Sequence, residues 1–172
     1  TDCALQNKAK RVYAVDVGTN QLVWKLRNDS RVVVKEKTNF RHATTDLFEY
    51  ELPNIATIDV SFISLKLIFE PLKDILNDGD DIVALIKPQF EAGREDVGKK
   101  GIVKDAKIHQ RVIENVISYA NECQFSIQNL TYSPITGGEG NIEFLAHFKV
   151  GGTNSLLQVE QVVQEAHDCF KG

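Results

Sequence analysis

The stretch Asp81-Ile82-Val83-Ala84-Leu85-Ile86-Lys87-Pro88 decides the fold class. It is a nearly continuous apolar run that ends in a lysine and a proline, which is the pattern of a strand buried in a parallel sheet. Similar runs at residues 11–17 and 55–60 each carry an aspartate at their carboxyl end. In open α/β sheets, ligands bind outside the carboxyl ends of the strands, so these charged residues mark the expected site.

Helical segments alternate with these strands. Asp105 can cap an amphipathic helix whose apolar positions from Ile108 to Ala120 recur with a period near 3.6. Strands expected at 125–132 and 142–150 are joined by a glycine-containing loop too short for a parallel crossover, so this pair should be antiparallel. The sequence therefore predicts an α/β, Rossmann-like fold with a mostly parallel sheet and an antiparallel last strand. Further predicted segments are a helix end at 3–9, a helical turn at 22–26, a strand around 32–34, helices at 65–76 and 156–170, and a polar loop at 89–104. Pro71 should kink the helix at 65–76 or lie near the start of a second helical piece.

The composition is that of an ordinary globular protein. The chain has 172 residues, 42% hydrophobic and 26% charged, which fits one compact domain with a full core. No apolar stretch approaches the roughly 18 residues of a membrane span, and no signal peptide opens the chain, so we expect a cytoplasmic protein. The three cysteines form no CxxC pair and the four histidines show no metal spacing, so we expect no metal site.

Charge is distributed in blocks along the chain, although the net charge is −4. Residues 8–41 contain nine Lys or Arg against three acids, and residues 84–113 contain seven against four. The segments between and after them are acidic. Ordinary solvated surface explains this pattern, and so does a basic face, folded together from both blocks, that follows a phosphate backbone.

Four charged residues are candidates for the site. Asp16 ends the first strand, where an acid either accepts hydrogen bonds from ribose hydroxyls or caps a turn. Asp59 and Lys87 end neighbouring strands, so their side chains should converge, either as a structural ion pair or as a base with its partner. Glu143 follows the glycine loop, where it is either a solvated edge residue or part of the same site.

Several separated motifs resemble the haemolysin A/TlyA family of RNA 2′-O-methyltransferases, whose catalytic domain is FtsJ-like. They follow the family's order over nearly the whole chain, which makes the resemblance specific. The motifs lie at residues 13–18, 22–27, 38–41, 59–65, 85–91, 98–105 and 133–144.

This resemblance implies S-adenosyl-L-methionine as the cofactor. Asp16, with Val17 beside it, looks like the acid that binds the cofactor ribose. Asn39 and Phe40 lie where the family's adenine-binding segment falls, and Asp59 would help to hold the methyl-donor region.

The resemblance also implies the reaction, methylation of a ribose 2′-hydroxyl on RNA, with ribosomal RNA as the expected partner. Asp59, Lys87 and Glu143 match three members of a Lys-Asp-Lys-Glu tetrad. Lys87 would be the base, Asp59 would orient it, and Glu143 would orient the tetrad's other lysine or the ribose.

Some family features are expected to be absent from this chain. In the family, one more strand comes before the strand at 11–17. That strand, the glycine-rich cofactor loop and the tetrad's first lysine would all precede Thr1, and so would an S4-type RNA-binding module. Residues 1–172 are therefore expected to form one FtsJ-like domain that is incomplete at its amino terminus, which puts cofactor binding and turnover by this chain alone in doubt.

Three other functions remain open. Strands with terminal acids agree with a nicotinamide-dependent dehydrogenase. The antiparallel last strand and the set of Asp59, Lys87 and Glu143 agree with it less well. A non-catalytic RNA-binding module is favoured by the missing cofactor loop. The haemolysin name suggests a pore former, which no apolar span or strongly apolar amphipathic helix supports.

Overall fold

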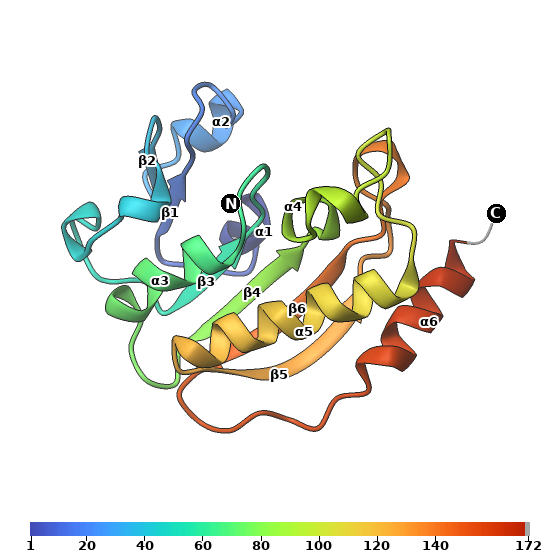
Figure 1. The fold of residues 1–172 in the computed structure, drawn as a ribbon. Helices are drawn as coiled ribbons and strands as arrows, with labels where there is room; N and C mark the ends of the chain where they lie inside the picture. Colours follow the sequence, from blue (N-terminus) through green and yellow to red (C-terminus); the bar gives the residue numbers. More distant parts are fainter. Residues whose placement is uncertain (171–172) are drawn as a thin grey trace. The chain divides into compact units, whose positions relative to one another are not determined.

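A computed structural model describes residues 1–170, which form two compact units. We refer to residues 1–52 as the N-terminal unit and to residues 53–170 as the C-terminal unit. Each unit contains its own sheet, two-stranded in the first (β1-β2) and four-stranded in the second (β3-β4-β6-β5) (Figure 1).

The N-terminal unit is built on a short parallel pair. β1 (Val12–Val15) lies beside β2 (Val32–Lys35), with Val12 opposite Val32, and β-branched residues favour such pairing. Both strands are only half-buried along their length. The ring of Tyr13 packs edge-on against Phe48, with ring centroids 4.9 Å apart. The helices are α1 (Asp2–Gln6) and α2 (Trp24–Arg27), followed by 3-10 turns at Phe40–His42 and Thr45–Leu47.

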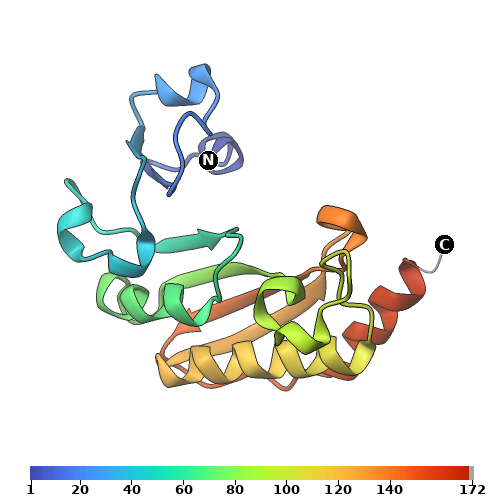
Figure 2. The same ribbon diagram turned by 45° about the horizontal axis from the view of Figure 1, so that its top comes forward.

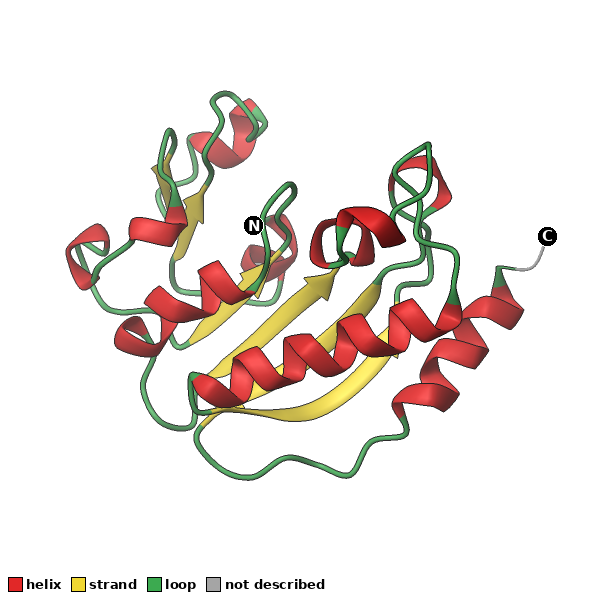
Figure 3. Ribbon diagram, in the orientation of Figure 1, coloured by secondary structure: helices red, strands yellow, loops and turns green. Residues whose placement is uncertain are grey.

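The C-terminal unit contains a mixed sheet (Figure 3). β3 (Ile55–Ile58) is parallel to β4 (Asp81–Ile86), while β6 (Phe144–Val150) is antiparallel to both β4 and β5 (Phe125–Tyr132). Three strands therefore run in one direction and β6 runs against them. The helices are α3 (Lys66–Ile75), α4 (Pro88–Glu91), α5 (Ala106–Glu122) and α6 (Val159–Cys169), with 3-10 turns at Arg94–Asp96 and Gly138–Gly140.

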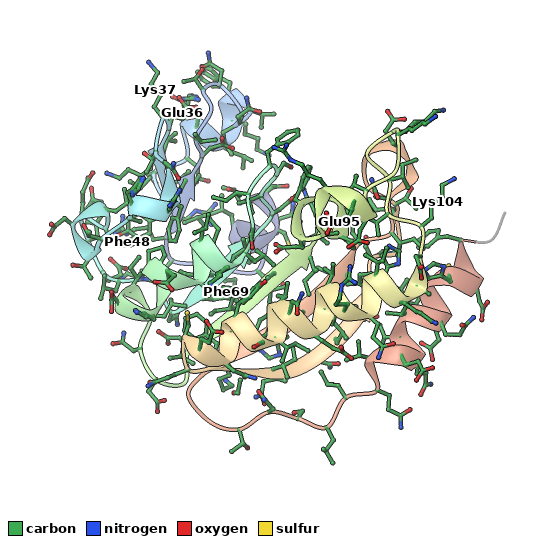
Figure 4. The ribbon with its side chains drawn as sticks, in the orientation of Figure 1. Glu36, Lys37, Phe48, Phe69, Glu95 and Lys104 are labelled. Carbon is green, nitrogen blue, oxygen red and sulfur yellow. The ribbon has the colours of Figure 1, made fainter. Side chains whose placement is uncertain are left out.

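One face of this sheet forms the core. Burial alternates along β4 because successive side chains point to opposite faces. Phe69 of α3, labelled in Figure 4, contacts the rings of Phe125 and Phe148 at centroid distances of 5.8 and 5.5 Å. His109 of α5 packs on Phe144 of the same face, and Figures 1 and 2 show α3 and α5 covering that face together.

The structure confirms the predicted α/β organisation and the antiparallel pairing of the last two strands. Three local features differ from the prediction. The polar loop at 89–104 contains most of α4, because Pro88 occupies the first helical position, where its missing N–H costs nothing. α3 continues through Pro71, which is buried with the rest of that helix face. α6 begins at Val159, three residues later than expected.

Candidate functional site

Lys87 and Asp59 meet at the carboxyl edge of the four-stranded sheet. Asp59 directly follows β3 and Lys87 directly follows β4, and parallel strands end at the same edge. The Lys87 Nζ lies 2.6 Å from the Asp59 Oδ1 and also donates to the Ser61 Oγ at 3.2 Å. The side chain of Lys87 is only 14% exposed, whereas that of Asp59 is 73% exposed. The amine is therefore fixed on one side by two oxygen acceptors.

Glu143 lies at the same edge, on the neighbouring strand. β4 pairs with β6 so that Ile86 is opposite Phe144, which places Lys87 and Glu143 one residue beyond that pair on adjacent strands. Glu143 is buried, and its Oε1 accepts a hydrogen bond from the Gln89 Nε2 at 3.0 Å. Among residues 1–170, no hydrogen bond joins Glu143 directly to Lys87 or Asp59; its side-chain partner is Gln89, two residues after Lys87 along the chain.

Two features of this corner depend on close packing around Glu143. A Cβ at Gly137 would lie 2.0 Å from the Glu143 Oε1, so any larger residue there would displace the carboxylate from its present position. The side-chain oxygen of Gln89 is buried and has no hydrogen-bond partner within the part of the chain that the structure describes. A buried acceptor without a donor is costly, and such groups often mark a functional site.

Glu91 fixes the loop that carries Asp59 and Ser61. Its carboxylate accepts hydrogen bonds from the Ser64 Oγ and from the backbone N–H of Leu65, both at 2.7 Å. Burial raises the pKa of the Glu91 carboxyl above its ordinary value, although these two donors act in the opposite direction. The contact ties α4, which follows Lys87, to the start of α3, and so holds the two parts of the site together.

An exposed aromatic ring borders the site. Phe62 adjoins Ser61, is 90% exposed and has a φ of +62°, a conformation that costs a non-glycine residue about 1–2 kcal/mol. Its ring lies against Phe90, with centroids 4.8 Å apart. The strained backbone at Phe62 presents a large apolar face to solvent next to Ser61, and strained residues of this kind cluster at functional sites.

The N-terminal unit carries the residues predicted to bind cofactor. Asp16 follows β1, and its Oδ1 accepts from the Gly18 N–H at 2.7 Å. The backbone N–H of Thr38, just after β2, donates to the Asp16 carbonyl at 3.0 Å, so both strand ends meet at one edge of this sheet. Asn39 caps the following 3-10 turn by accepting from the Arg41 N–H at 3.2 Å.

The remaining groups of this edge are open to contact. The Asp16 Oδ2 makes no hydrogen bond within residues 1–170 and remains able to accept from vicinal hydroxyls of a ribose. Val17 is 73% exposed and Phe40 is half-buried. These donors, acceptors and apolar surfaces fit the adenosine part of a nucleotide-like cofactor.

A family model described as FtsJ-like methyltransferase matches residues 1–150 of the chain. The chain belongs to the FtsJ-like methyltransferase family. This confirms the resemblance found in the sequence motifs.

FtsJ-like relatives support the assignment over most of the chain. "Putative rRNA methyltransferase YqxC" of Bacillus subtilis is 55% identical over 177 residues, covering 99% of this chain and 63% of that protein. "16S/23S rRNA (cytidine-2′-O)-methyltransferase TlyA" of Mycobacterium tuberculosis is 39% identical over 144 residues, covering 84% of this chain and 53% of that protein. The chain thus spans less than two thirds of the length of these curated relatives.

Solved structures show the same fold. "Putative hemolysin from Streptococcus thermophilus" is 54% identical with a TM-score of 0.95, covering 99% of this chain and 62% of that one. A SAM-dependent methyltransferase from Methanosarcina mazei is 12% identical with a TM-score of 0.59, covering 87% of this chain and 86% of that one. This distant match shows the fold alone, and it confirms the Rossmann-like methyltransferase architecture.

Two further findings concern metal-ligating side chains and membrane-spanning helices. Within the described residues, no three His, Cys, Asp or Glu side chains are grouped so that they could hold a metal ion. No helix in residues 1–170 is both long enough and apolar enough to cross a membrane.

Sequence reasoning missed three residues of the FtsJ-like site. Ser61, Gln89 and Glu91 were part of matched motifs, but no role was predicted for any of them. Glu91 lies in a segment that reads as a polar loop, and its hydrogen bonds to Ser64 and Leu65 join segments about 26 residues apart. The contacts of Ser61 and Gln89 join segments 26 and 54 residues apart, and no local pattern reveals them.

Proposed function

We propose that this chain is the catalytic part of an S-adenosylmethionine-dependent enzyme that methylates ribose 2′-hydroxyls of RNA, with ribosomal RNA as the substrate. The observation that carries the proposal is the Lys87 amine, nearly enclosed and held 2.6 Å from Asp59 at the carboxyl edge of the sheet. The names of the relatives YqxC and TlyA support ribosomal RNA. No observation on residues 1–170 favours the dehydrogenase or the pore-forming alternative.

Lys87 supplies the base. A 2′-hydroxyl is a weak nucleophile, and a positioned base typically contributes about 10²–10⁴-fold to such a step. The Lys87 Nζ would accept the hydroxyl proton as the ribose oxygen forms its bond to the methyl carbon; the bond between that carbon and the cofactor sulfur would break, with S-adenosylhomocysteine as the leaving group. Asp59 and Ser61 fix the nitrogen, so that its lone pair is directed at the bound hydroxyl. Asp59 then stabilises the ammonium that results.

Glu143 and Phe62 position the nucleotide. Gln89 holds one carboxylate oxygen of Glu143 and leaves the other to orient the ribose or a further lysine. The exposed ring of Phe62 offers a stacking surface for a base, and stacking on aromatic side chains is a common way to hold unpaired RNA bases. Together they would hold the reacting hydroxyl within about 3 Å of Lys87.

Each unit carries predicted cofactor-binding residues of its own. Asp16 would accept hydrogen bonds from the cofactor ribose, and Val17, Asn39 and Phe40 would surround the adenine. The exposed carboxylate of Asp59 would also contact the methyl-donor region. When bound, S-adenosylmethionine supplies a methyl group that its positive charge has already activated. Because the proposed substrate is ribosomal RNA, we place the activity in the cytoplasm.

A methyl-transfer assay on the full-length protein tests this function. Ribosomal RNA and isotope-labelled S-adenosylmethionine should yield a labelled 2′-O-methyl nucleoside after digestion. A substrate with 2′-deoxyribose at the modified position should accept no methyl group, because the 2′-hydroxyl is what distinguishes RNA from DNA at a site. A label found on a base, or transfer that does not depend on the 2′-hydroxyl, would contradict the proposal.

A further inference from the structure

Positive charge in the C-terminal unit is concentrated in one segment. Residues 94–111 contain six Lys or Arg and three acids, whereas the rest of residues 53–172 contains five Lys or Arg and 14 acids. This segment leads from α4 into α5. A strongly local positive charge on an otherwise acidic unit indicates a site for an anionic partner.

Three lysines of this segment line a pocket of about 440 Å³. Lys99, Lys100 and Lys104 are exposed, and none of them forms an ion pair with another described residue. Figure 4 labels Lys104 on the loop that enters α5. The two acids that also line the pocket are already engaged: Asp96 forms an ion pair with Arg111, and Asp105 accepts from the Lys107 N–H to cap α5. Within residues 1–170, the three lysines therefore face only one aspartate without an ion-pair partner, Asp105, so the pocket keeps a net positive charge.

Asn141 fastens this lysine loop to the glycine loop of the candidate site. Its side chain is buried, accepts from the Val103 N–H at 3.0 Å, and donates to the carbonyls of Gly101 and Gly138 at 2.9 and 3.1 Å. Gly137 donates to the Asn141 carbonyl at 2.8 Å and packs against Glu143. Figures 1 and 2 both show the two loops side by side next to α4. The lysines are thus held at the same edge as Lys87 and Glu143.

We propose that Lys99, Lys100 and Lys104 form a phosphate-binding surface for the RNA strand that flanks the target ribose. This inference rests on the proposed function, because it takes the nucleotide at Lys87 to belong to a longer strand. Phosphate contacts fix the position and orientation of a nucleic acid without reading its sequence. The hydrogen bonds of Asn141 join the two loops and so fix these lysines relative to Lys87. Binding of the strand would therefore position the ribose at Lys87.

RNA fits this surface better than a lipid headgroup does. A membrane-binding surface combines basic residues with an exposed apolar face that enters the bilayer. The pocket instead has lysine ammonium groups around a small apolar floor from Ile102 and Ile108, both only partly exposed. Binding to anionic vesicles is nevertheless a clear alternative outcome of the test.

Salt-dependent binding of the full-length protein to ribosomal RNA tests the surface. Lys99→Gln, Lys100→Gln and Lys104→Gln are made singly and together, and the slope of log K against log salt is measured. Each lysine that contacts a phosphate should reduce the slope by about 1, so the triple variant should lose about 3. The triple variant should also have a raised KM for RNA in the methyl-transfer assay, because fewer phosphate contacts hold the strand. The matched control is Lys73→Gln, an exposed lysine in the last turn of α3 at the other end of the strands, which should leave the slope unchanged.

The possible results separate this proposal from the proposed function. An unchanged slope in a folded triple variant, with methylation intact, overturns the phosphate surface and leaves the function standing. If the triple variant has a reduced slope but the wild-type protein transfers no methyl group to RNA, the phosphate surface is supported and the proposed function is overturned. Lysine-dependent binding to phosphatidylserine vesicles with no lysine-dependent RNA binding overturns the surface as well.

Discussion

The two units of this molecule contrast in how they support their functional groups. Of the 26 buried apolar side chains among residues 1–170, Leu5 and Phe48 lie in the N-terminal unit and the other 24 lie in the C-terminal unit. Lys87, Asp59 and Glu143 are thus supported by a packed sheet, whereas Asp16 and Asn39 lie in loops that follow two half-buried strands. The contrast indicates that Lys87, Asp59 and Glu143 are held by a well-packed core, and that the N-terminal unit has little buried apolar surface of its own to stabilise it.

The largest expected effect of this contrast is on stability. Phe69→Ala removes a fully buried ring that contacts Phe125 and Phe148, and should lower the free energy of unfolding of the C-terminal unit by about 3–5 kcal/mol. Phe48→Ala should reduce protection only within residues 1–52. Hydrogen exchange read peptide by peptide measures both changes. Loss of protection across the C-terminal unit in Phe48→Ala would show that the two cores are not independent.

A smaller expected effect is the pH dependence of the free energy of unfolding of the C-terminal unit. Burial, and then the neighbouring His167, lower the pKa of His109 from 6.5 to about 4, while Asp105 and the Val103 carbonyl act in the opposite direction. The unfolded chain therefore binds a proton that the folded chain does not, so this contribution is complete above pH 6.5 and is lost as the pH falls towards 4. The loss amounts to about 3 kcal/mol.

Urea unfolding at a series of pH values measures this dependence. His109→Gln should flatten the stability profile between pH 6.5 and 4, because the buried group no longer titrates. His42→Gln, at an exposed histidine of the N-terminal unit, serves as the matched control and should leave the profile unchanged. A profile that keeps its full slope in His109→Gln would rule out this histidine as its source.

Much of the fold follows from local sequence patterns. β5 spans the predicted residues 125–132, and Asp105 caps α5 as expected, because periodicity and capping residues act over a few positions. Two helices were predicted less well. Most of α4 lies in a segment that reads as a polar loop, and α6 begins later than its apolar pattern suggests. Helices of a single turn depend on tertiary contacts more than on their own sequence.

For the candidate site, the sequence predicted the two residues that meet but not the contacts around them. Strand-end logic and the family motifs led to Asp59 and Lys87, and the structure brings these two into contact. The contacts that support them could not be predicted, since Gln89 reaches Glu143 and Glu91 reaches Ser64 across long sequence separations. The catalytic role of these residues remains a prediction, which kinetics must test.

The most direct test compares Lys87→Met with Asp16→Asn in the full-length protein. Single-turnover methyl transfer to RNA and the Kd for S-adenosylhomocysteine are measured for both. Lys87→Met should slow transfer by about 10²–10⁴-fold and leave the Kd near the wild-type value. Asp16→Asn should weaken binding by about 10–100-fold and leave transfer at saturating cofactor nearly unchanged. Near-normal transfer by Lys87→Met would contradict the account, because the amine held at Asp59 would then not be the base.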